Sequence, residues 1–318
     1  MKKIALLICL VLIIPLSGCD NTEFSKKEVS KSISVEKSGV TLTNIQKIYK
    51  KIRDSLDAPQ EYFKLTVIES PGVDKERVKE IVSAYEKAIN LYPIANNKKI
   101  TWVFLNENEK QWWIKKTSEI DSQPNLEWWD SGCEISPSSV CAYGNVDTEF
   151  PIFYMVIGSY SQWSDHDKYL ADHEAAHVYQ MVKWKNSHSN CWIDEGYANA
   201  VGMAMAAKTI DVRSHRDSQI DALGNIFTEY KSFSVNDWVK AFNKINSDKE
   251  FCFNKGAGYS MGMIAIESMY DLYDARVLDE FFIEYSKTKN FNKTLLKYFN
   301  IDENQFYENV AAYAKSVV

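Results

Sequence analysis

The sequence has few of the residues on which several common classes of protein depend. It contains no long block of basic residues, and its formal net charge is −6. A basic face is the usual sign of nucleic-acid binding, so we do not expect nucleic acid as a partner. The six cysteines include no C-x-x-C pair, which disfavours a zinc site built from cysteine ligands. Hydrophobic residues make up 45% of the chain, which indicates a globular protein.

A long apolar run is also missing. The N-terminal run, Ile4–Leu16, is too short to span a membrane comfortably as a mature helix. It follows two lysines and precedes small residues, which is the layout of a signal peptide. The sequence Leu16-Ser17-Gly18-Cys19 resembles a bacterial lipobox. The resemblance implies that residues 1–18 are removed and that Cys19 is lipidated; an ordinary signal peptide or a membrane anchor is the alternative.

Lipidation would decide where the protein resides. We expect acyl chains on Cys19 to hold it on the exported side of a bacterial cytoplasmic membrane, because several chains anchor more firmly than one. Asp20 resembles the signal for retention at the inner membrane, which in a Gram-negative cell faces the periplasm. Residues 19–40 are polar, and we interpret them as a flexible tether. Removing residues 1–18 takes away two lysines and changes the formal net charge from −6 to −8.

The rest of the chain divides into a part with strands, 41–158, and a helical part, 159–318. The expected elements of the first part are helices Leu42–Leu56, Asp74–Leu91 and Glu107–Ile120, strands Tyr62–Ile68, Ile100–Leu105, Ala142–Val146 and Pro151–Ile157, and an irregular loop Asp121–Ser139. Strands that come first and helices that follow predict an α+β fold with a small mixed sheet.

The motif with the clearest chemistry is H-E-x-x-H, formed by His173, Glu174 and His177. On a helix, residues at i and i+4 share one face, so both imidazoles can approach one metal ion. The glutamate beside them is placed to take a proton from a water molecule. With five histidines in 318 residues, a chance match is roughly a one per cent event. An ordinary helix with polar residues on its buried face is the alternative.

A third zinc ligand is offered by Glu195, eighteen residues after His177. It lies near the start of the apolar segment Ile193–Ala207, which predicts a buried helix, with Asn190 or Asp194 as the N-cap. An acidic residue in a first turn could instead complement the helix dipole. Next to the upstream motif the ligand role is the better interpretation, and it predicts one Zn²⁺ ion held by His173, His177 and Glu195.

The two histidines, the glutamate between them and Glu195 together resemble the active-site signature of the gluzincin metallopeptidases, which include thermolysin and the aminopeptidase N family. The W-x-x-E-G-x-A sequence around Glu195 is similar to the glutamate helix of aminopeptidase N. The resemblance covers about half of the chain, from Tyr154 to the C-terminus, whose helical end is similar to smaller bacterial peptidase-MA-like domains. It implies a thermolysin-like catalytic core in which three ligands bind zinc and Glu174 is the general base.

Further segments extend and limit this resemblance. Gly258–Ile266 is similar to the Y-S-K-G-x-x-x-L segment of these enzymes, which implies that Tyr259 stabilises the oxyanion. The G-x-M-E-N motif, which grips the free amino end of an aminopeptidase substrate, does not occur, so aminopeptidase activity is not implied. From its order in the chain, Phe150–Ile157 is interpreted as the edge strand that aligns the substrate. Asn199, one helical turn after Glu195, is a candidate to hydrogen-bond a ligand imidazole.

Four cysteines remain once one is assigned to the signal peptide and one to the lipid site. An even number in an exported chain predicts two disulfides, with three possible pairings. We expect Cys133–Cys141 to close the irregular loop. We expect Cys191–Cys252 to tie the segment before the third zinc ligand to the segment before the oxyanion donor.

The function expected from these features is zinc-dependent hydrolysis of peptide bonds in a peptide or protein substrate. Two alternatives stay open: a non-catalytic zinc-binding lipoprotein with a binding or scaffold role, and a zinc hydrolase that cleaves a non-peptide bond. Three ligands with a glutamate and a tyrosine nearby favour an open, catalytic zinc site over a closed, structural one.

Overall fold

The computed structural model describes residues 42–56, 64–90, 92, 99–121, 126–131, 135–137, 140–145, 151–159, 165–184, 190–208, 210–253 and 256–318. The predicted signal peptide, the lipid site Cys19 and the tether lie outside the described residues, and so does Cys133. Within the described ranges, no helix is long and apolar enough to cross a membrane.

The helices are α1 (Leu42–Ser55), α2 (Lys75–Ile89), α3 (Lys110–Ile120), α4 (Trp128–Ser131), α5 (Asp165–Trp184), α6 (Cys191–Ala206), α7 (Arg213–Asp221), α8 (Val235–Ser247), α9 (Lys249–Phe253), α10 (Ala257–Leu272), α11 (Ala275–Thr288), α12 (Phe291–Phe299) and α13 (Glu303–Val317), with 3₁₀ turns η1 (Ala222–Asn225) and η2 (Tyr230–Ser232). The strands are β1 (Lys64–Glu69), β2 (Lys99–Leu105), β3 (Val140–Asn145) and β4 (Ile152–Ile157). The α+β expectation is confirmed.

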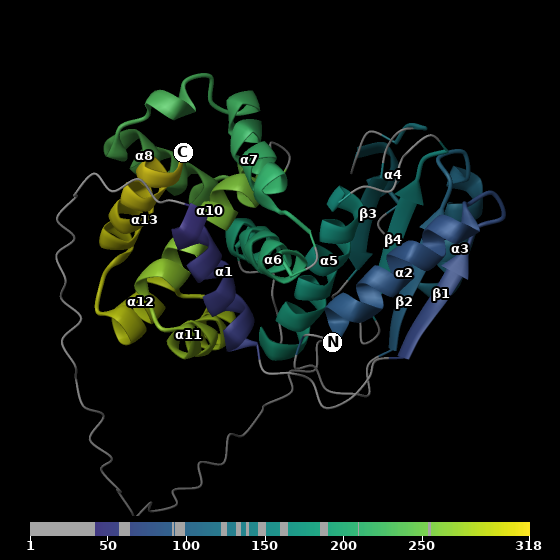
Figure 1. Cartoon of the computed structure of the whole chain (residues 1–318), viewed down its shortest axis with the longest axis horizontal. Helices are drawn as coiled ribbons and strands as arrows, with labels where there is room; N and C mark the ends of the chain where they lie inside the picture. The colour runs from purple at the N-terminus through teal and green to yellow at the C-terminus, as the bar shows by residue number, and fades with distance from the viewer. Residues whose placement is uncertain are drawn as a thin grey trace, which may run out of the picture. The chain divides into compact units, whose positions relative to one another are not determined.

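The four strands form one sheet in the order β1-β2-β4-β3 (Figure 1). Strands β1, β2 and β4 are parallel, with Thr101 opposite Ile152, and β3 is antiparallel to β4, with Gly144 opposite Phe153. The small mixed sheet is therefore present as expected.

The predicted edge strand is wrong, because its residues Ile152–Ile157 form β4, which lies between β2 and β3. All six residues of β4 are buried, and a continuous apolar run is typical of a strand that is covered on both faces. The strand that ends the order on this side is β3, and it contacts α5. The order of segments along the chain suggests that β4 lies next to the motif helix α5. The pairing of the strands instead places β3 next to α5.

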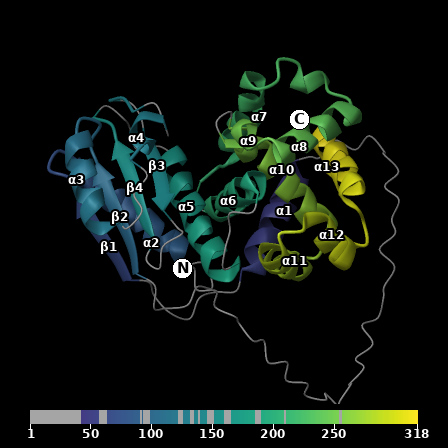
Figure 2. The same ribbon diagram turned by 180° about the vertical axis from the view of Figure 1, so that it is seen from behind.

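Helices cover both faces of the sheet (Figures 1 and 2). Successive residues of a strand point to opposite faces. On one face, Trp102 of β2 meets Tyr85 of α2 edge to face, with ring centroids 5.0 Å apart. On the other face, Val103 of β2 belongs to a smaller buried cluster with Trp113 of α3 and Trp128 of α4. The larger core continues from the first face through α5 into the helical part.

Most helices form where the apolar spacing predicts them, and the differences have local causes. α2 begins after Asp74, whose carboxylate caps the helix by accepting from two backbone N–H groups. α3 begins at Lys110, later than expected, because the carboxylate of Glu109 accepts hydrogen bonds from the backbone N–H groups of Asn106 and Gly72 and fixes a turn there. The short helix α4 lies inside the expected loop.

Three helices at the centre of the helical part approach one another through glycines. A Cβ on Gly196 in α6 would lie 2.2 Å from the carbonyl carbon of Gly262 in α10. A Cβ on Gly202 in α6 would lie 2.9 Å from the backbone nitrogen of His173 in α5. Only glycine permits such close backbone approach. These contacts place α6 between the motif helix α5 and α10 (Figure 2).

The helices around this centre are joined by a buried ion pair. Glu267 of α10 is fully buried, and its two oxygens accept hydrogen bonds from Arg216 at 3.0 and 2.9 Å. The hydroxyls of Tyr49 and Tyr313 donate to the same carboxylate at 3.0 and 3.1 Å. A buried charge is tolerated when it is paired and hydrogen-bonded in this way. The cluster links α1, α7, α10 and α13, and α1 accordingly packs with the helical part although it precedes the sheet in the chain.

Candidate metal centre

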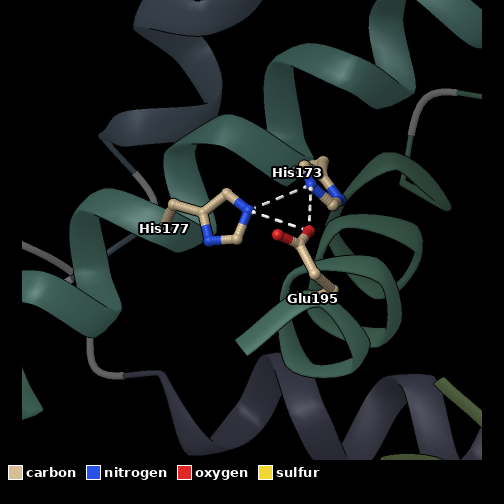
Figure 3. Close-up of side chains that lie close together, drawn as sticks. All are labelled: His173, His177 and Glu195. Carbon is tan, nitrogen blue, oxygen red and sulfur yellow. Dashed lines mark hydrogen bonds and ion pairs between the residues drawn. The ribbon is translucent and has the colours of Figure 1, made fainter. Parts of the chain in front are cut away.

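Two neighbouring helices bring three ligand atoms to one point (Figure 3). His173 and His177 of α5 turn their Nε2 atoms toward each other at 3.1 Å. Oε2 of Glu195 on α6 lies 3.5 Å from Nε2 of His173 and 3.4 Å from Nε2 of His177. The three predicted ligands are therefore brought together, and among the described residues they form a group able to hold a metal ion.

The size of this triangle suits zinc. Zinc binds histidine nitrogen and carboxylate oxygen at about 2.0–2.2 Å, in tetrahedral geometry. A tetrahedron of that size has edges of about 3.3–3.5 Å, and the triangle has edges of 3.1, 3.4 and 3.5 Å. Oε2 of Glu195 is also buried and makes no hydrogen bond with the described residues. A cation at the centre of the triangle would satisfy this oxygen.

The electrostatics of the triangle favour a bound cation. Burial, the largest single influence, lowers the pKa of the His177 imidazole, but the charge and hydrogen bond of Glu195, the charge of Glu174 and the contact with Gln180 together outweigh burial and raise this pKa to about 9. Burial by itself raises the pKa of the Glu195 carboxyl, yet the two imidazoles hold it below its usual value. The site therefore attracts positive charge, for which a proton and a metal ion compete.

Both imidazoles are held by further side chains. Nδ1 of His177 lies 2.8 Å from Oε1 of Gln180, which is fully buried. Nδ1 of His173 lies 3.4 Å from the hydroxyl of Tyr169, and that hydroxyl donates a hydrogen bond to Oδ1 of Asn199. Asn199, the candidate to hydrogen-bond an imidazole, instead accepts from the hydroxyl of Tyr169, which itself lies against His173. Ligand histidines commonly donate their second nitrogen in this way.

The sequence motifs do not point to Gln180 or Tyr169. Gln180 lies three residues after His177, and Tyr169 lies four residues before His173, so each shares a helix face with its ligand. A side chain that can accept a hydrogen bond, three or four residues from a candidate ligand histidine, is the sequence feature that could identify such a partner. The ring of Tyr169 also stacks on the half-buried His215 of α7, with centroids 5.6 Å apart.

Glu174, the predicted base, is buried beside the triangle. Its Oε2 lies 3.6 Å from the position that a Cβ on Gly144 of β3 would take. The carboxylate of Glu174 thus faces the sheet near β3, the strand that ends the strand order where β4 was predicted to do so. Burial, reinforced by the charge of Glu195, raises the pKa of Glu174, although the two imidazoles oppose this effect.

Tyr259, the predicted oxyanion donor, lies in the first turn of α10 and reaches the same site. Its ring stacks on the ring of His173, with centroids 6.1 Å apart and planes inclined by 21°. The charge of Glu195 and burial raise the pKa of Tyr259 well above its usual value. The hydroxyl therefore stays protonated and able to donate a hydrogen bond.

The start of α6 differs in detail from the prediction. The helix begins at Cys191, with Asn190 as its N-cap, so Glu195 lies in the second turn rather than the first. The dipole explanation for an acidic residue loses force there, because that effect is confined to the first turn.

The Cys191–Cys252 disulfide is confirmed. A Cβ on Gly258, next to Tyr259, would lie 2.7 and 2.8 Å from its two sulfurs, so the disulfide packs against the first turn of α10. Cys141 also takes part in a disulfide. Its predicted partner Cys133 lies outside the described residues, so that pairing stays a prediction.

Comparison with protein-family models, curated proteins and solved structures finds no match. The resemblance to gluzincins therefore depends on the sequence signature and on the geometry of this site.

Proposed function

We propose that this chain is a zinc-dependent metallopeptidase of the gluzincin type, with a thermolysin-like catalytic core, anchored by lipid in the bacterial envelope. The observation that carries the proposal is the triangle of ligand atoms from α5 and α6, with edges of 3.1–3.5 Å. The side chains of His177 and Glu195 remain 16% and 15% exposed. A site with three protein ligands and access to solvent suits catalysis better than a closed structural site does.

The chemistry follows from the groups around the triangle. A bound Zn²⁺ ion would polarise the scissile carbonyl and make a water molecule more acidic. Glu174 takes a proton from the attacking water and passes it to the leaving amine as the C–N bond breaks. The raised pKa of Glu174 makes its carboxylate a stronger base than an ordinary glutamate, and a catalytic group works best when its pKa lies near the working pH. Tyr259 donates a hydrogen bond to the carbonyl oxygen as that oxygen becomes negative.

The strand β3 is the proposed guide for the peptide substrate. It ends the strand order of the sheet beside the buried carboxylate of Glu174. An extended peptide can add to such an edge through backbone hydrogen bonds. A peptide aligned there would pass Glu174 and the ligand triangle, which supports cleavage of peptide bonds over other hydrolyses.

Metal content is the first test. Elemental analysis of the purified protein should find one zinc ion per chain, and His177→Ala should lose it. If the wild-type protein takes up no zinc or other divalent metal, the proposal fails.

Peptide cleavage is the second test. The wild-type protein should cut members of a mixed peptide library, with the products identified by mass spectrometry, and a chelator should stop the cleavage. Glu174→Gln should keep zinc and lose hydrolysis, because an amide cannot accept the proton. Turnover by that variant would reject Glu174 as the base. Bound zinc without cleavage of any peptide would favour a scaffold role or a non-peptide substrate.

Membrane attachment is tested separately with the full chain. Fatty-acid labelling and membrane fractionation should show acylated protein, and Cys19→Ser should abolish both labelling and membrane retention. Unlabelled but processed protein would indicate an ordinary signal peptide.

A further inference from the structure

We propose that Gln180 is a positioning residue that holds His177 and Glu195 in register with each other. The inference rests on the proposed function, because it concerns two of the proposed zinc ligands. Gln180 lies on α5, three residues after His177, and its side chain is completely buried. Its amide contacts both helices of the site: Oε1 lies 2.8 Å from Nδ1 of His177, and Nε2 donates to the backbone oxygen of Asp194 at 2.9 Å.

The two contacts fix the orientation of the amide. A backbone carbonyl can only accept a hydrogen bond, so the group that faces Asp194 must be the NH₂ of Gln180. The oxygen of the amide then faces His177. Because that oxygen can only accept, Nδ1 of His177 must carry the proton that joins them.

This assignment determines what the imidazole presents to the site. With its hydrogen on Nδ1 engaged by Gln180, His177 keeps Nε2 as its ligand atom, and Nε2 is the atom that faces Glu195 and His173. The ring is also prevented from turning about its χ2 angle, because a turn would break the bond to Gln180. One side chain thus selects both the ligand nitrogen and its direction.

The second contact extends the effect to the other helix. Asp194 directly precedes Glu195 in α6, so the bond from Gln180 holds the backbone at the third ligand. Like the bond from Tyr169 to Asn199, this bond joins the two ligand-bearing helices beside the ligands. Gln180 therefore couples the direction of the His177 ring to the position of the Glu195 backbone.

Two substitutions separate this role from simple core filling. Gln180→Met keeps a similar volume but removes both hydrogen bonds. Gln180→Glu keeps an acceptor for Nδ1 of His177 and loses the donor to Asp194. Removing the partner of a ligand histidine typically lowers metal affinity by about 10–100-fold. We expect a loss of that size in Gln180→Met and a smaller loss in Gln180→Glu, because a carboxylate still supports the imidazole and only the bond to Asp194 is lost.

The control is Ser286→Ala. The buried hydroxyl of Ser286 on α11 donates to the backbone oxygen of Trp184 at the end of α5. This variant also loses a buried hydrogen bond to one of the two ligand-bearing helices, but it leaves the imidazole untouched. It should lower the melting temperature without changing zinc affinity, measured by competition with a chromogenic chelator.

A second readout does not require metal. In protein with ¹⁵N-labelled histidine, NMR should show a slowly exchanging Nδ1–H proton for His177 in the wild type and in Gln180→Glu. In Gln180→Met this proton should exchange fast or disappear. Wild-type zinc affinity in Gln180→Met, or an unchanged Nδ1–H signal, overturns the inference. A wild-type protein that binds no zinc rejects the proposed function, and the NMR measurement then still decides whether Gln180 orients His177. If Gln180→Met fails to fold, the same signal in Gln180→Glu decides.

Discussion

Replacing Gly262 with alanine should disturb the proposed zinc site without changing any of its three candidate ligands. A Cβ at this position would lie 2.3 Å from the backbone oxygen of Trp192 and 2.8 Å from Cα of Gly196, both in α6. An ordinary contact needs about 3.4 Å. Helices α6 and α10 must therefore separate by roughly 1 Å, since neither obstacle is a flexible side chain.

The size of the effect follows from this displacement. Overpacking of a well-packed core typically costs about 1–3 kcal/mol, which for a domain of this size corresponds to a fall of about 2–10 °C in melting temperature. Glu195 is next to Gly196 and moves with α6, whereas zinc–ligand distances in proteins stay within about 0.2 Å of their usual values. We expect zinc affinity to fall at least about tenfold.

The assays are thermal unfolding and competition with a chelator. Gly224→Ala is the matched control, because a Cβ there meets only a side-chain carbon of Tyr230 at 3.6 Å. Gly224→Ala should leave the melting temperature and the zinc affinity unchanged. Wild-type stability and zinc affinity in Gly262→Ala would show that contact between these two backbones does not set the position of Glu195.

Three further predictions concern single groups. Tyr259→Phe should lower kcat/KM by about 100–1000-fold, because it removes the proposed oxyanion donor; steady-state kinetics that show less than a threefold loss would reject that role. Tyr169→Phe removes the hydroxyl between His173 and Asn199 and should weaken zinc binding by about tenfold, and chelator competition checks it. Glu267→Ala leaves the buried Arg216 without its partner and should cost about 3–5 kcal/mol in urea unfolding. The double variant Glu267→Leu with Arg216→Met should recover only part of that loss, because the hydroxyls of Tyr49 and Tyr313 still lose their acceptor. Equal losses of stability in the single and the double variant would mean that the unpaired charge of Arg216 does not cause the destabilisation.

The parts of this molecule that local spacing determines were predictable. His173 and His177 share a helix face because they are four residues apart, and the apolar spacing of α1 and α2 indicates their buried sides. The approach of Glu195 is a weaker inference, because it depends on the close packing of α6 against α5 at Gly202, which no periodicity reveals. Close packing of backbones depends on tertiary context, which a single sequence does not display.

The differences from the prediction also have physical causes. The segment that forms β4 was assigned to the edge because it precedes the motif helix, yet the order of strands in a sheet need not follow the chain. Its uninterrupted apolar character was the better indicator, since it is typical of an inner strand. Asn199 is a candidate for a direct bond to an imidazole from its spacing alone, whereas Tyr169 is the side chain that lies against His173.

The bond between Cys191 and Cys252 makes the assembly of the site depend on where the chain folds. The two cysteines are 61 residues apart in the sequence. By the chain-entropy model, closing a loop of that length in the unfolded chain contributes about 4 kcal/mol to the stability of the folded protein. Thiols stay reduced in the cytosol and oxidise after export. A copy retained inside the cell would therefore lack the link between the beginnings of α6 and α10. Under the proposed function, we expect hydrolysis to begin only after export across the cytoplasmic membrane, which would spare the proteins of the cell that makes it.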